Sequence, residues 1–243
     1  MKKKKFILVI PARYGSSRLK GKPLKKILGL PMIIRTALQC QKSVKKENIY
    51  IATDNLKIMN VCRVHGFKSI LIKGKILTGT DRVAEVAKKI KADYYLNVQG
   101  DEPLFNPSDI TKLVNNIKKN HKNVLLGFTE IKNKKDIKSP HVPKVCFNKN
   151  KELFYASRSA IPLNFSNNKI KYYRQVLAYS FPRNELMQFA KLKKKTPLEE
   201  YEDIEILRFL EIGIKVKLIE MSKKSHPVDT KEDLKKIIKL LKK

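Results

Sequence analysis

The chain has 243 residues, 42% of them hydrophobic, which is enough to bury the core of one globular α/β domain and excludes a disordered chain. Its formal net charge is +32, because 54 Lys and Arg outnumber 22 Asp and Glu. Only nine of the 54 are Arg, and the lysines are spread along the chain without a zinc-finger, helix-turn-helix or RNP pattern. Composition therefore predicts a basic surface that attracts polyanions nonspecifically, and no specific nucleic-acid-binding module.

Cysteine usage and the N-terminus give no sign of export. Cys40, Cys62 and Cys146 lack metal-site spacing, and their odd number in apolar contexts predicts reduced thiols in a cytoplasmic protein. The N-terminal apolar run FILVI is far shorter than a signal peptide or a membrane span and ends in Pro-Ala-Arg. We predict that this run is the first strand and that the chain does not insert into a membrane.

The first half of the chain alternates between strand-like and helix-like patterns. The expected strands are residues 5–10, 48–53, 68–72 and 94–99, and the expected helices are residues 31–42, 55–65, 80–91 and 107–119. Strands that alternate with helices of this length are typical of βαβ units. The pattern predicts an α/β fold with a doubly wound, mostly parallel sheet.

The second half begins with shorter, β-rich runs that favour antiparallel pairing. Expected strands are residues 123–131, 143–150, 152–157, 172–181 and 213–221, and expected helices are residues 183–192, 199–212 and from 231 onward. We predict one domain, in which a core of residues 1–122 and 213–243 carries a β-rich insertion of residues 123–212. The clearest loops are residues 139–143 and 165–169.

The segment NVQGDEP, residues 97–103, carries the most specific signal. An apolar strand runs directly into a Gly, two carboxylates and a Pro. Ligands of open α/β sheets bind beyond the carboxyl ends of the strands, so Asp101 is a candidate metal ligand. Taken alone, the segment fits a solvated Gly-Asp-Glu-Pro turn better, and only other segments favour the metal site.

The loop after the first strand, within LVIPARYGSSRLKGKPL, is a candidate phosphate site. Its glycines let the backbone approach a ligand, and its cationic side chains are Arg13, Arg18, Lys20 and Lys22. The spacing is neither that of a P-loop nor G-x-G-x-x-G. The loop suits a triphosphate, and a solvated basic loop explains it equally well.

The segments TGTDR and VDT each stand at a helix start. Thr78 and Asp81 have capping-box spacing, which accounts for both but not for Arg82. A second capping box at residues 230–233 follows Asp229. Each segment alone is explained by helix capping, but Asp229 also supplies a second carboxylate for a metal.

Taken together and in this order, the motifs resemble the 3-deoxy-manno-octulosonate cytidylyltransferase family. The matching segments cover nearly the whole chain and are IPARYGSSRLKGKPL, IATD, TGTDRVAEV, NVQGDEP, YASRSAIP, TPLE, EILRFLE and VDTKEDL. The resemblance implies a Rossmann-like nucleotidyltransferase fold. It also implies transfer of CMP from CTP to the anomeric hydroxyl of 3-deoxy-manno-octulosonate (Kdo), a 3-deoxy-2-keto sugar acid, for lipopolysaccharide biosynthesis.

The resemblance also implies roles for particular residues. The implied nucleotide contacts are Arg13, Ser16, Arg18, Lys22, Thr80, Arg82 and Gln99. The implied catalytic groups are Arg13, Lys22, Asp101 and Asp229, and the two carboxylates are implied to hold Mg²⁺ as the cofactor. Such a site would polarise the α-phosphate for in-line attack, with the cations stabilising the pyrophosphate that leaves.

The implied sugar-acid pocket departs from the family pattern. Its residues are Arg158, Gln175, Tyr179, Glu205 and Arg208, and the family assigns β-rich residues 123–212 to this pocket and to dimerisation. Gln175-Val176-Leu177 stands where the family usually has His-x-Gly, and Ile206 stands where it has Gln. A pocket with altered polar partners can prefer another ligand, so an 8-amino analogue of Kdo or a nonulosonate remains an alternative substrate.

Assembly and two rival functions stay open at the level of sequence. The resemblance implies a homodimer, and the apolar residues Val145, Phe147, Leu153 and Phe154 fit a dimer contact or a monomer core equally well. A noncatalytic relative is disfavoured by the retained basic and acidic site residues. A basic nucleic-acid-binding protein is supported by net charge alone.

Overall fold

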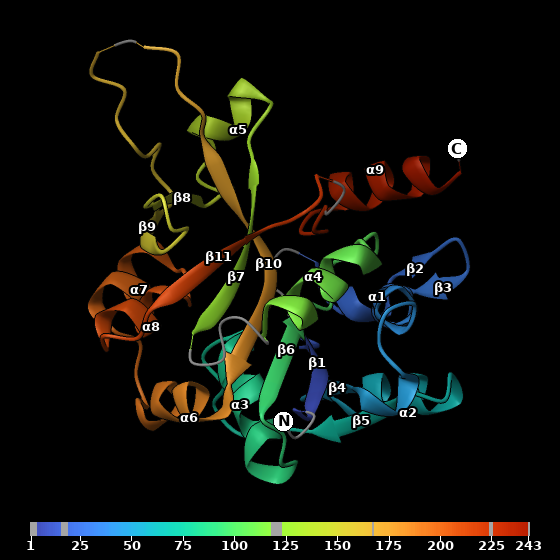
Figure 1. Ribbon diagram of the computed structural model, residues 1–243. Coiled ribbons are helices and arrows are strands. Elements are labelled where there is room, and N and C mark those ends of the chain that lie inside the picture. The colour runs from blue at the N-terminus through green and yellow to red at the C-terminus, as the bar shows by residue number, and fades with distance from the viewer. Residues whose placement is uncertain (1–3, 16–18, 118–122, 167, 224–225, 243) are drawn as a thin grey trace.

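The main sheet is mixed and mostly parallel, as the sequence predicts (Figure 1). The computed structural model describes residues 4–15, 19–117, 123–166, 168–223 and 226–242. In spatial order the main strands are β11 (Val216–Glu220), β7 (Val124–Glu130), β10 (Tyr173–Pro182), β6 (Tyr94–Val98), β1 (Phe6–Ala12), β4 (Ile49–Thr53) and β5 (Lys68–Leu71). All neighbours pair in parallel except at β10, which is antiparallel to both β6 and β7.

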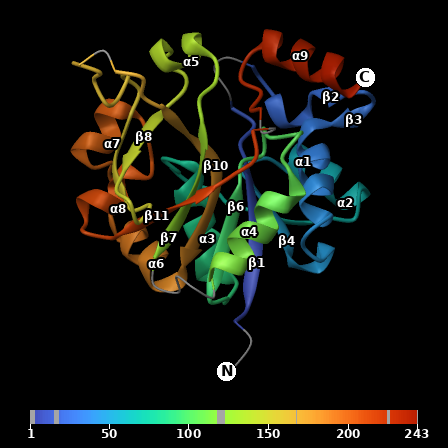
Figure 2. The ribbon, with the colours of Figure 1, turned by 45° about the horizontal axis from the view of Figure 1, so that its top comes forward.

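Helices cover both faces of the sheet, which confirms the doubly wound fold (Figure 2). The helices of one face are α1 (Met32–Gln41), α2 (Leu56–Val64) and α4 (Pro107–Ile117), and those of the other face are α3 (Gly79–Lys89), α6 (Arg183–Lys191) and α8 (Leu207–Glu211). Alternation along β1 separates the two cores, since Leu8 and Ile10 face the first layer and Ile7 and Val9 the second. Strand β1 is apolar throughout because both of its faces are buried.

The predicted helix at residues 199–212 is wrong as a single element. The structure has two short helices, α7 (Pro197–Glu202) and α8, separated by a turn. Asp203 lies at φ 49° in the left-handed region, which ends α7, and Asp tolerates this conformation better than most residues. The chain then turns at Glu205 and Ile206 before α8 begins.

The sequence missed several short elements. They are the hairpin β2 (Lys26–Ile27) and β3 (Leu30–Pro31), helix α5 (Lys134–Lys138), and the 3₁₀ turns η1 (Lys22–Leu24) and η2 (Lys46–Asn48). None of them is long enough to show a helical or strand period. The hairpin matters for the site because it supports the C-terminal segment.

The insertion predicted at residues 123–212 does not have a separate sheet. Its strands β7 and β10 lie in the main sheet between β6 and β11, so neither boundary of the insertion is a boundary of the sheet. Two further strands, β8 (Lys144–Phe147) and β9 (Leu153–Ser157), join this sheet through β10. The sheet therefore does not separate the predicted core from the predicted insertion, and this division of the chain stays a prediction.

The C-terminal helix α9 (Lys231–Leu241) packs beside the hairpin at the carboxyl edge of the sheet (Figure 1). A small apolar cluster joins Ile27, Met32, Val228 and Ile237. The cluster brings residues 228–230 against the first loop, although more than 200 residues separate them in the chain. Within the described ranges, no helix has the length and apolar character needed to cross a membrane.

Candidate active site at the carboxyl edge of the sheet

Three residues far apart in the sequence meet beyond the carboxyl ends of β1 and β6. The Nζ of Lys22 lies 2.5 Å from Oδ2 of Asp101 and 3.1 Å from Oδ1 of Asp229. The backbone N–H of Val228 donates to the carbonyl oxygen of Asp101 at 2.9 Å, which holds the segment before α9 on the turn after β6. The predicted convergence of the two carboxylates is thus present in the geometry.

Close backbone packing fixes the turn that carries Asp101. The N–H of Gly100 donates to the carbonyl oxygen of Pro11 at 3.3 Å, and the hydroxyl of Thr36 donates to the carbonyl oxygen of Gly100 at 3.1 Å. A Cβ on Gly100 would lie 2.8 Å from the oxygen of Pro11, so a side chain does not fit there. The turn after β6 is therefore pressed directly against the end of β1.

The charge of Lys22 is stabilised by Asp101 and Asp229. Burial favours the neutral amine of Lys22, but Asp101 and Asp229 outweigh that effect and raise its pKa above the usual value. The buried Oδ1 of Asp101 has no hydrogen-bond partner among the described residues. An acidic pair with a vacant carboxylate oxygen has the chemistry of a hard divalent cation site.

The carboxylate pair fits Mg²⁺ better than a metal held by protein alone. No group of three or more His, Cys, Asp or Glu side chains gathers as a metal site in the part of the chain that the structure describes. Magnesium is commonly held by one or two carboxylates, with substrate phosphates and water completing its shell. Asp101 and Asp229 supply that number of carboxylates.

A second pair of cations lies near the basic loop. Arg82, on α3, is almost fully buried. Burial lowers the pKa of Arg82, Asp54 opposes the change, and Arg13 lowers the pKa further through like-charge repulsion. Arg13 is thus one of the charged groups that act on the Arg82 guanidinium. Ser16 and Arg18, also predicted as nucleotide contacts, lie outside the described residues.

Glu205 links the predicted nucleotide residues to a predicted sugar residue. Its carboxylate accepts the backbone N–H of Thr80 at 2.9 Å and the amide of Gln99 at 3.3 Å. Burial raises the pKa of Glu205, and the hydrogen bond from Thr80 opposes that change. Burial and a hydrogen bond with Glu205 raise the pKa of the Tyr179 phenol well above its usual value, so Tyr179 is a neutral donor.

Comparison with known proteins decides the family. A cytidylyltransferase family model matches residues 7–223. A 3-deoxy-manno-octulosonate cytidylyltransferase of Fusobacterium nucleatum is 38% identical over 98% of this chain and 97% of its own length. The chain belongs to this family. A second member, from Escherichia coli, is 33% identical over 98% of this chain and 96% of its own length. This assignment makes the chain a nucleotidyltransferase.

Solved structures agree with the assignment. A CMP:2-keto-3-deoxy-manno-octonic acid synthetase complexed with CTP superposes with a TM-score of 0.92, at 33% identity and 98% coverage of both chains. The inositol-1-phosphate CTP transferase of T. maritima superposes with a TM-score of 0.71 at 14% identity, covering 98% of this chain and 95% of its own. The second likeness shows the shared fold alone.

One residue predicted for the sugar-acid pocket of this cytidylyltransferase has a different setting. Arg208 is fully buried, and its guanidinium lies 2.8 Å from Asp81 and 2.5 Å from Glu199. It also lies 3.8 Å from the ring centroid of Phe189. Burial would lower the pKa of Arg208, but the two carboxylates raise it. The guanidinium is thus paired with two carboxylates inside the protein, and its part in the sugar-acid pocket stays a prediction.

The other residues predicted for the pocket differ in whether their polar groups are already bonded within the protein. Arg158 is partly exposed, and its guanidinium donates to the carbonyl oxygens of Pro140, Glu202 and Asp203. Gln175 is buried near the carboxyl edge, and its side-chain oxygen has no partner in the described ranges. Ile206 is packed in the apolar core below α8. Of the three departures from the family pattern, Gln175 therefore has an available polar group, whereas Leu177 packs against the apolar core and Ile206 is buried in it.

Sequence reasoning missed two polar contributors to the site. Asp54 accepts the backbone N–H of Tyr14, and Thr36 supports the turn at Gly100. Asp54 had the same signal as Asp101, since it is an acidic residue directly after a buried strand. Thr36 is in the first turns of α1, where nothing in the helical pattern marks it.

Proposed function

We propose that the chain transfers CMP from CTP to the anomeric hydroxyl of Kdo and releases pyrophosphate. The observation that carries this proposal is the meeting of Lys22 with Asp101 and Asp229 at the carboxyl edge of the sheet. Support also comes from the names of the relatives and from the superposed synthetase, which contains CTP. Lipopolysaccharide biosynthesis is the pathway that fits this reaction.

The proposed CTP site extends from the first loop to Glu205. Arg13 and Lys22, with Arg82 beside them, face the phosphates, because cations beside a Gly-containing turn match several phosphate oxygens. Gln99 and the start of α3 at Thr80 contact the cytosine and ribose. Their shared acceptor, Glu205, fixes both in one orientation.

Asp101 and Asp229 are the residues that would hold Mg²⁺, which supplies charge neutralisation at the α-phosphate. The anomeric oxygen attacks the α-phosphorus, the bond to the bridging oxygen of pyrophosphate breaks, and the hydroxyl proton goes to solvent. Lys22 and Arg13 stabilise the charge on the leaving pyrophosphate. A covalent intermediate with the protein is unnecessary.

The proposed sugar-acid side uses Tyr179, Gln175 and Glu205. Tyr179 lies opposite Asn97 in the antiparallel pairing of β10 with β6. Gln175, four residues earlier in β10, lies opposite Phe128 of β7, beyond a register irregularity between Val176 and Tyr179. Arg158 can meet the sugar carboxylate only by leaving its backbone carbonyl partners. Kdo is the proposed acid, and an 8-amino analogue or a nonulosonate is the alternative.

A homodimer in the cytoplasm is the proposed state of the protein. Val145 and Leu153 are buried in the core of one chain, and Phe147 packs against that core, so these three residues complete the monomer. Phe154, on β9, is 63% exposed and Phe165, in the loop between β9 and β10, is 90% exposed, which leaves apolar area for a second copy. Light scattering would give a mass near 28.1 kDa if the dimer is absent.

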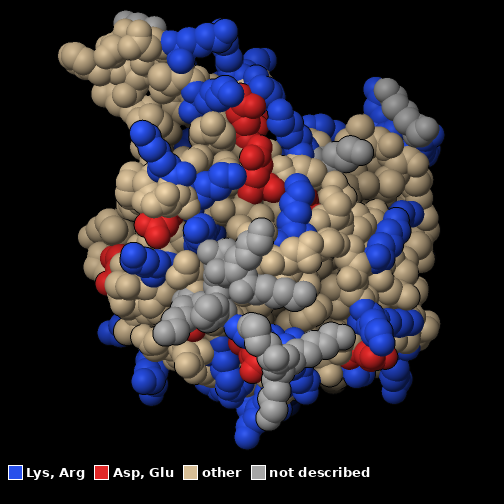
Figure 3. Space-filling model, in the orientation of Figure 1, with Lys and Arg blue, Asp and Glu red and all other residues tan. Residues whose placement is uncertain are grey.

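Surface charge gives little support to a nucleic-acid-binding function. On the face shown in Figure 3, Lys and Arg are scattered between Asp and Glu and do not outline one continuous stripe. Such a surface binds polyanions weakly and in a salt-dependent way.

The decisive experiment measures pyrophosphate release from CTP and Mg²⁺ with Kdo, its 8-amino analogue and a nonulosonate. We expect Kdo-dependent release and a product with the mass of CMP-Kdo. Release with another acid alone would change the substrate. The absence of release with every acid, from folded protein that is saturated with CTP and Mg²⁺, would contradict the proposed function.

A further inference from the structure

Asp54 connects two parts of the proposed CTP site that come from different strands. It follows β4, which lies between β1 and β5 in the sheet. Its Oδ1 accepts the backbone N–H of Tyr14 at 3.0 Å, in the loop that leaves β1. Its Oδ2 lies 3.4 Å from the guanidinium of Arg82, in the helix reached after β5. One carboxylate therefore bridges the loop and the helix.

On the loop side, the bridge holds the base of the cationic segment. The carbonyl oxygen of Tyr14 accepts the N–H of Gly21 at 3.2 Å, which closes the loop between these two residues. Gly21 has a φ of 65°, a conformation that a residue with a side chain adopts at a cost. Lys22 follows directly. Asp54 thus fixes the backbone of Tyr14, which lies next to Arg13 and also bonds Gly21, the residue before Lys22.

On the helix side, the bridge supports a guanidinium in an unfavourable place. Arg82 is 6% exposed, and it has Arg13 as a like-charged neighbour. Its other hydrogen bond is a long one, 3.5 Å, to the carbonyl oxygen of Ile72. Asp54 is the carboxylate that attracts Arg82 against these effects. Without this attraction, burial and the like charge of Arg13 would act unopposed on the charged form of Arg82.

Helix capping does not account for Asp54. The N-cap of α2 is Asn55, whose side chain accepts the backbone N–H of Lys57 at 2.8 Å. The helix begins without help from Asp54, so both oxygens of Asp54 are directed toward the nucleotide side. A role confined to the start of α2 would not explain contacts with two segments outside that helix.

We infer that Asp54 is a positioning residue for the triphosphate of CTP. It holds the backbone at Tyr14, beside Arg13, and the Arg82 guanidinium in place before the nucleotide arrives. This inference rests on the proposed function. Preorganisation of this kind strengthens binding because the ordering cost is met before the ligand arrives. The effect therefore falls on CTP affinity more than on the chemical step.

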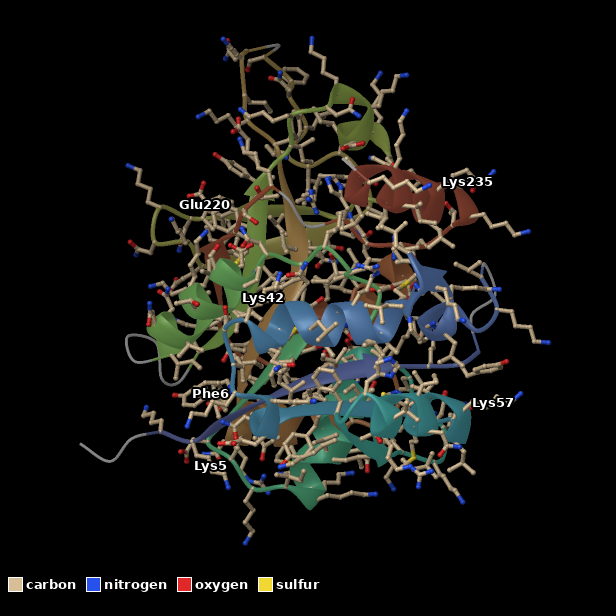
Figure 4. All side chains as sticks on the ribbon, turned by 90° about the vertical axis from the view of Figure 1, so that its right-hand side faces the viewer. Lys5, Phe6, Lys42, Lys57, Glu220 and Lys235 are labelled. Atoms are coloured by element: carbon tan, nitrogen blue, oxygen red, sulfur yellow. The ribbon has the colours of Figure 1, made fainter. Side chains whose placement is uncertain are left out.

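The chain offers a matched control at the opposite end of β1. Asp93 accepts the backbone N–H of Lys5 at 2.7 Å, a contact of the same kind as that between Asp54 and Tyr14. Figure 4 shows Lys5 and Lys57 at opposite ends of the sheet and helix layers. Asp93→Asn therefore reports what the loss of a similar carboxylate does far from the site.

The test is calorimetric titration of the parent, Asp54→Asn, Asp54→Ala and Asp93→Asn with CTP and with CMP. CMP lacks the two outer phosphates. We expect Asp54→Asn to weaken CTP binding about tenfold and Asp54→Ala to weaken it more, because Ala also loses the acceptor for Tyr14. CMP binding should change less than about threefold in all variants, and the KM for CTP should rise while kcat stays within about threefold of the parent.

Different failures have different meanings. If both Asp54 variants bind CTP as tightly as Asp93→Asn does, or lose CMP and CTP binding equally, the inference is overturned. If the parent fails to bind CTP, the proposed function fails and this inference fails with it. On an Arg82→Ala background Asp54→Asn should add little, and full additivity would contradict an action through Arg82.

Discussion

The nucleotide side and the sugar-acid side of the site differ in how their charged groups are occupied. On the nucleotide side, Lys22 contacts Asp101 and Asp229, and a buried oxygen of Asp101 has no partner in the described part of the chain. On the sugar-acid side, the guanidinium groups of Arg158 and Arg208 bond backbone carbonyls or buried carboxylates of the protein itself. In the proposed site, the ionic groups are thus arranged for CTP, whereas the sugar acid would meet neutral groups or displace Arg158 from its partners.

The largest expected effect comes from removing a carboxylate on the nucleotide side. Asp101→Asn and Asp229→Asn should each lower pyrophosphate release about 10³-fold at saturating Mg²⁺, a loss of several kcal/mol of charge stabilisation. Both variants should stay folded, because neither residue belongs to an apolar core. Asp93→Asn is the control. Near-parental turnover of folded Asp229→Asn would contradict the two-carboxylate site.

This half of the site was largely predictable because its signals are local. Asp101 and Lys22 are each adjacent to a strand and its turn, so a pattern of apolar residues followed by Gly and charge marks them. The pairing of Asp229 with Asp101 was proposed from the need for a second carboxylate and was implied by the family resemblance. Its physical basis, the N–H of Val228 on the carbonyl oxygen of Asp101, is a contact between backbone groups that no side-chain pattern records.

The sugar-acid side was predicted less well because burial depends on tertiary packing. Arg208 follows the family motif, yet the sequence does not show that Asp81, the N3 residue of one capping box, and Glu199, the N3 residue of another, both turn toward it. Ile206 likewise faces the core because α8 packs on the sheet. Neither fact follows from residue spacing alone.

Arg208→Met tests the comparison between the two sides of the site through the free energy of unfolding. Removing this guanidinium leaves two carboxylates without their buried partner, so the free energy of unfolding should fall by about 3–5 kcal/mol. Urea denaturation measures the change. Arg158→Met is the comparison variant and should lose far less stability, because its guanidinium is partly exposed, bonds backbone carbonyl oxygens and pairs with the exposed carboxylate of Asp203. A stable Arg208→Met variant with a large rise in the KM for Kdo would restore Arg208 to the substrate pocket.

Gln175→His should have a smaller effect, confined to the sugar acid. An imidazole at this position restores the residue type that the family usually has, and it can donate where the unpartnered oxygen of Gln175 cannot. We expect kcat/KM for Kdo to rise severalfold, by about 1 kcal/mol, with the KM for CTP unchanged. Steady-state kinetics with each substrate varied in turn measure both values.

The variant Ile206→Gln tests whether residue 206 belongs to the substrate pocket or to the apolar core. Because Ile206 is fully buried, its replacement by Gln should cost about 1–3 kcal/mol of stability without improving the use of Kdo. A gain from Ile206→Gln in a protein as stable as the parent would show that this side chain reaches the ligand. If Gln175→His leaves Kdo kinetics unchanged, the departure at residue 175 does not set specificity.

The smallest expected effect concerns His226, which lies in the segment leading to Asp229. Burial lowers the pKa of His226 below its ordinary value of 6.5, Lys236 and Arg174 lower it further, and Asp136 opposes them. The folded state therefore binds the proton less well than the unfolded state, so stability falls as pH drops from above 6.5 through the folded pKa. His226→Asn should remove this part of the slope, and melting temperatures of both proteins between pH 8 and pH 5 measure it. The segment of His226 contacts the turn at Asp101 through Val228, so the same measurement tests whether acid destabilises the nucleotide side of the site. If the melting temperatures of the two proteins change in parallel with pH, His226 does not contribute to the pH dependence of stability.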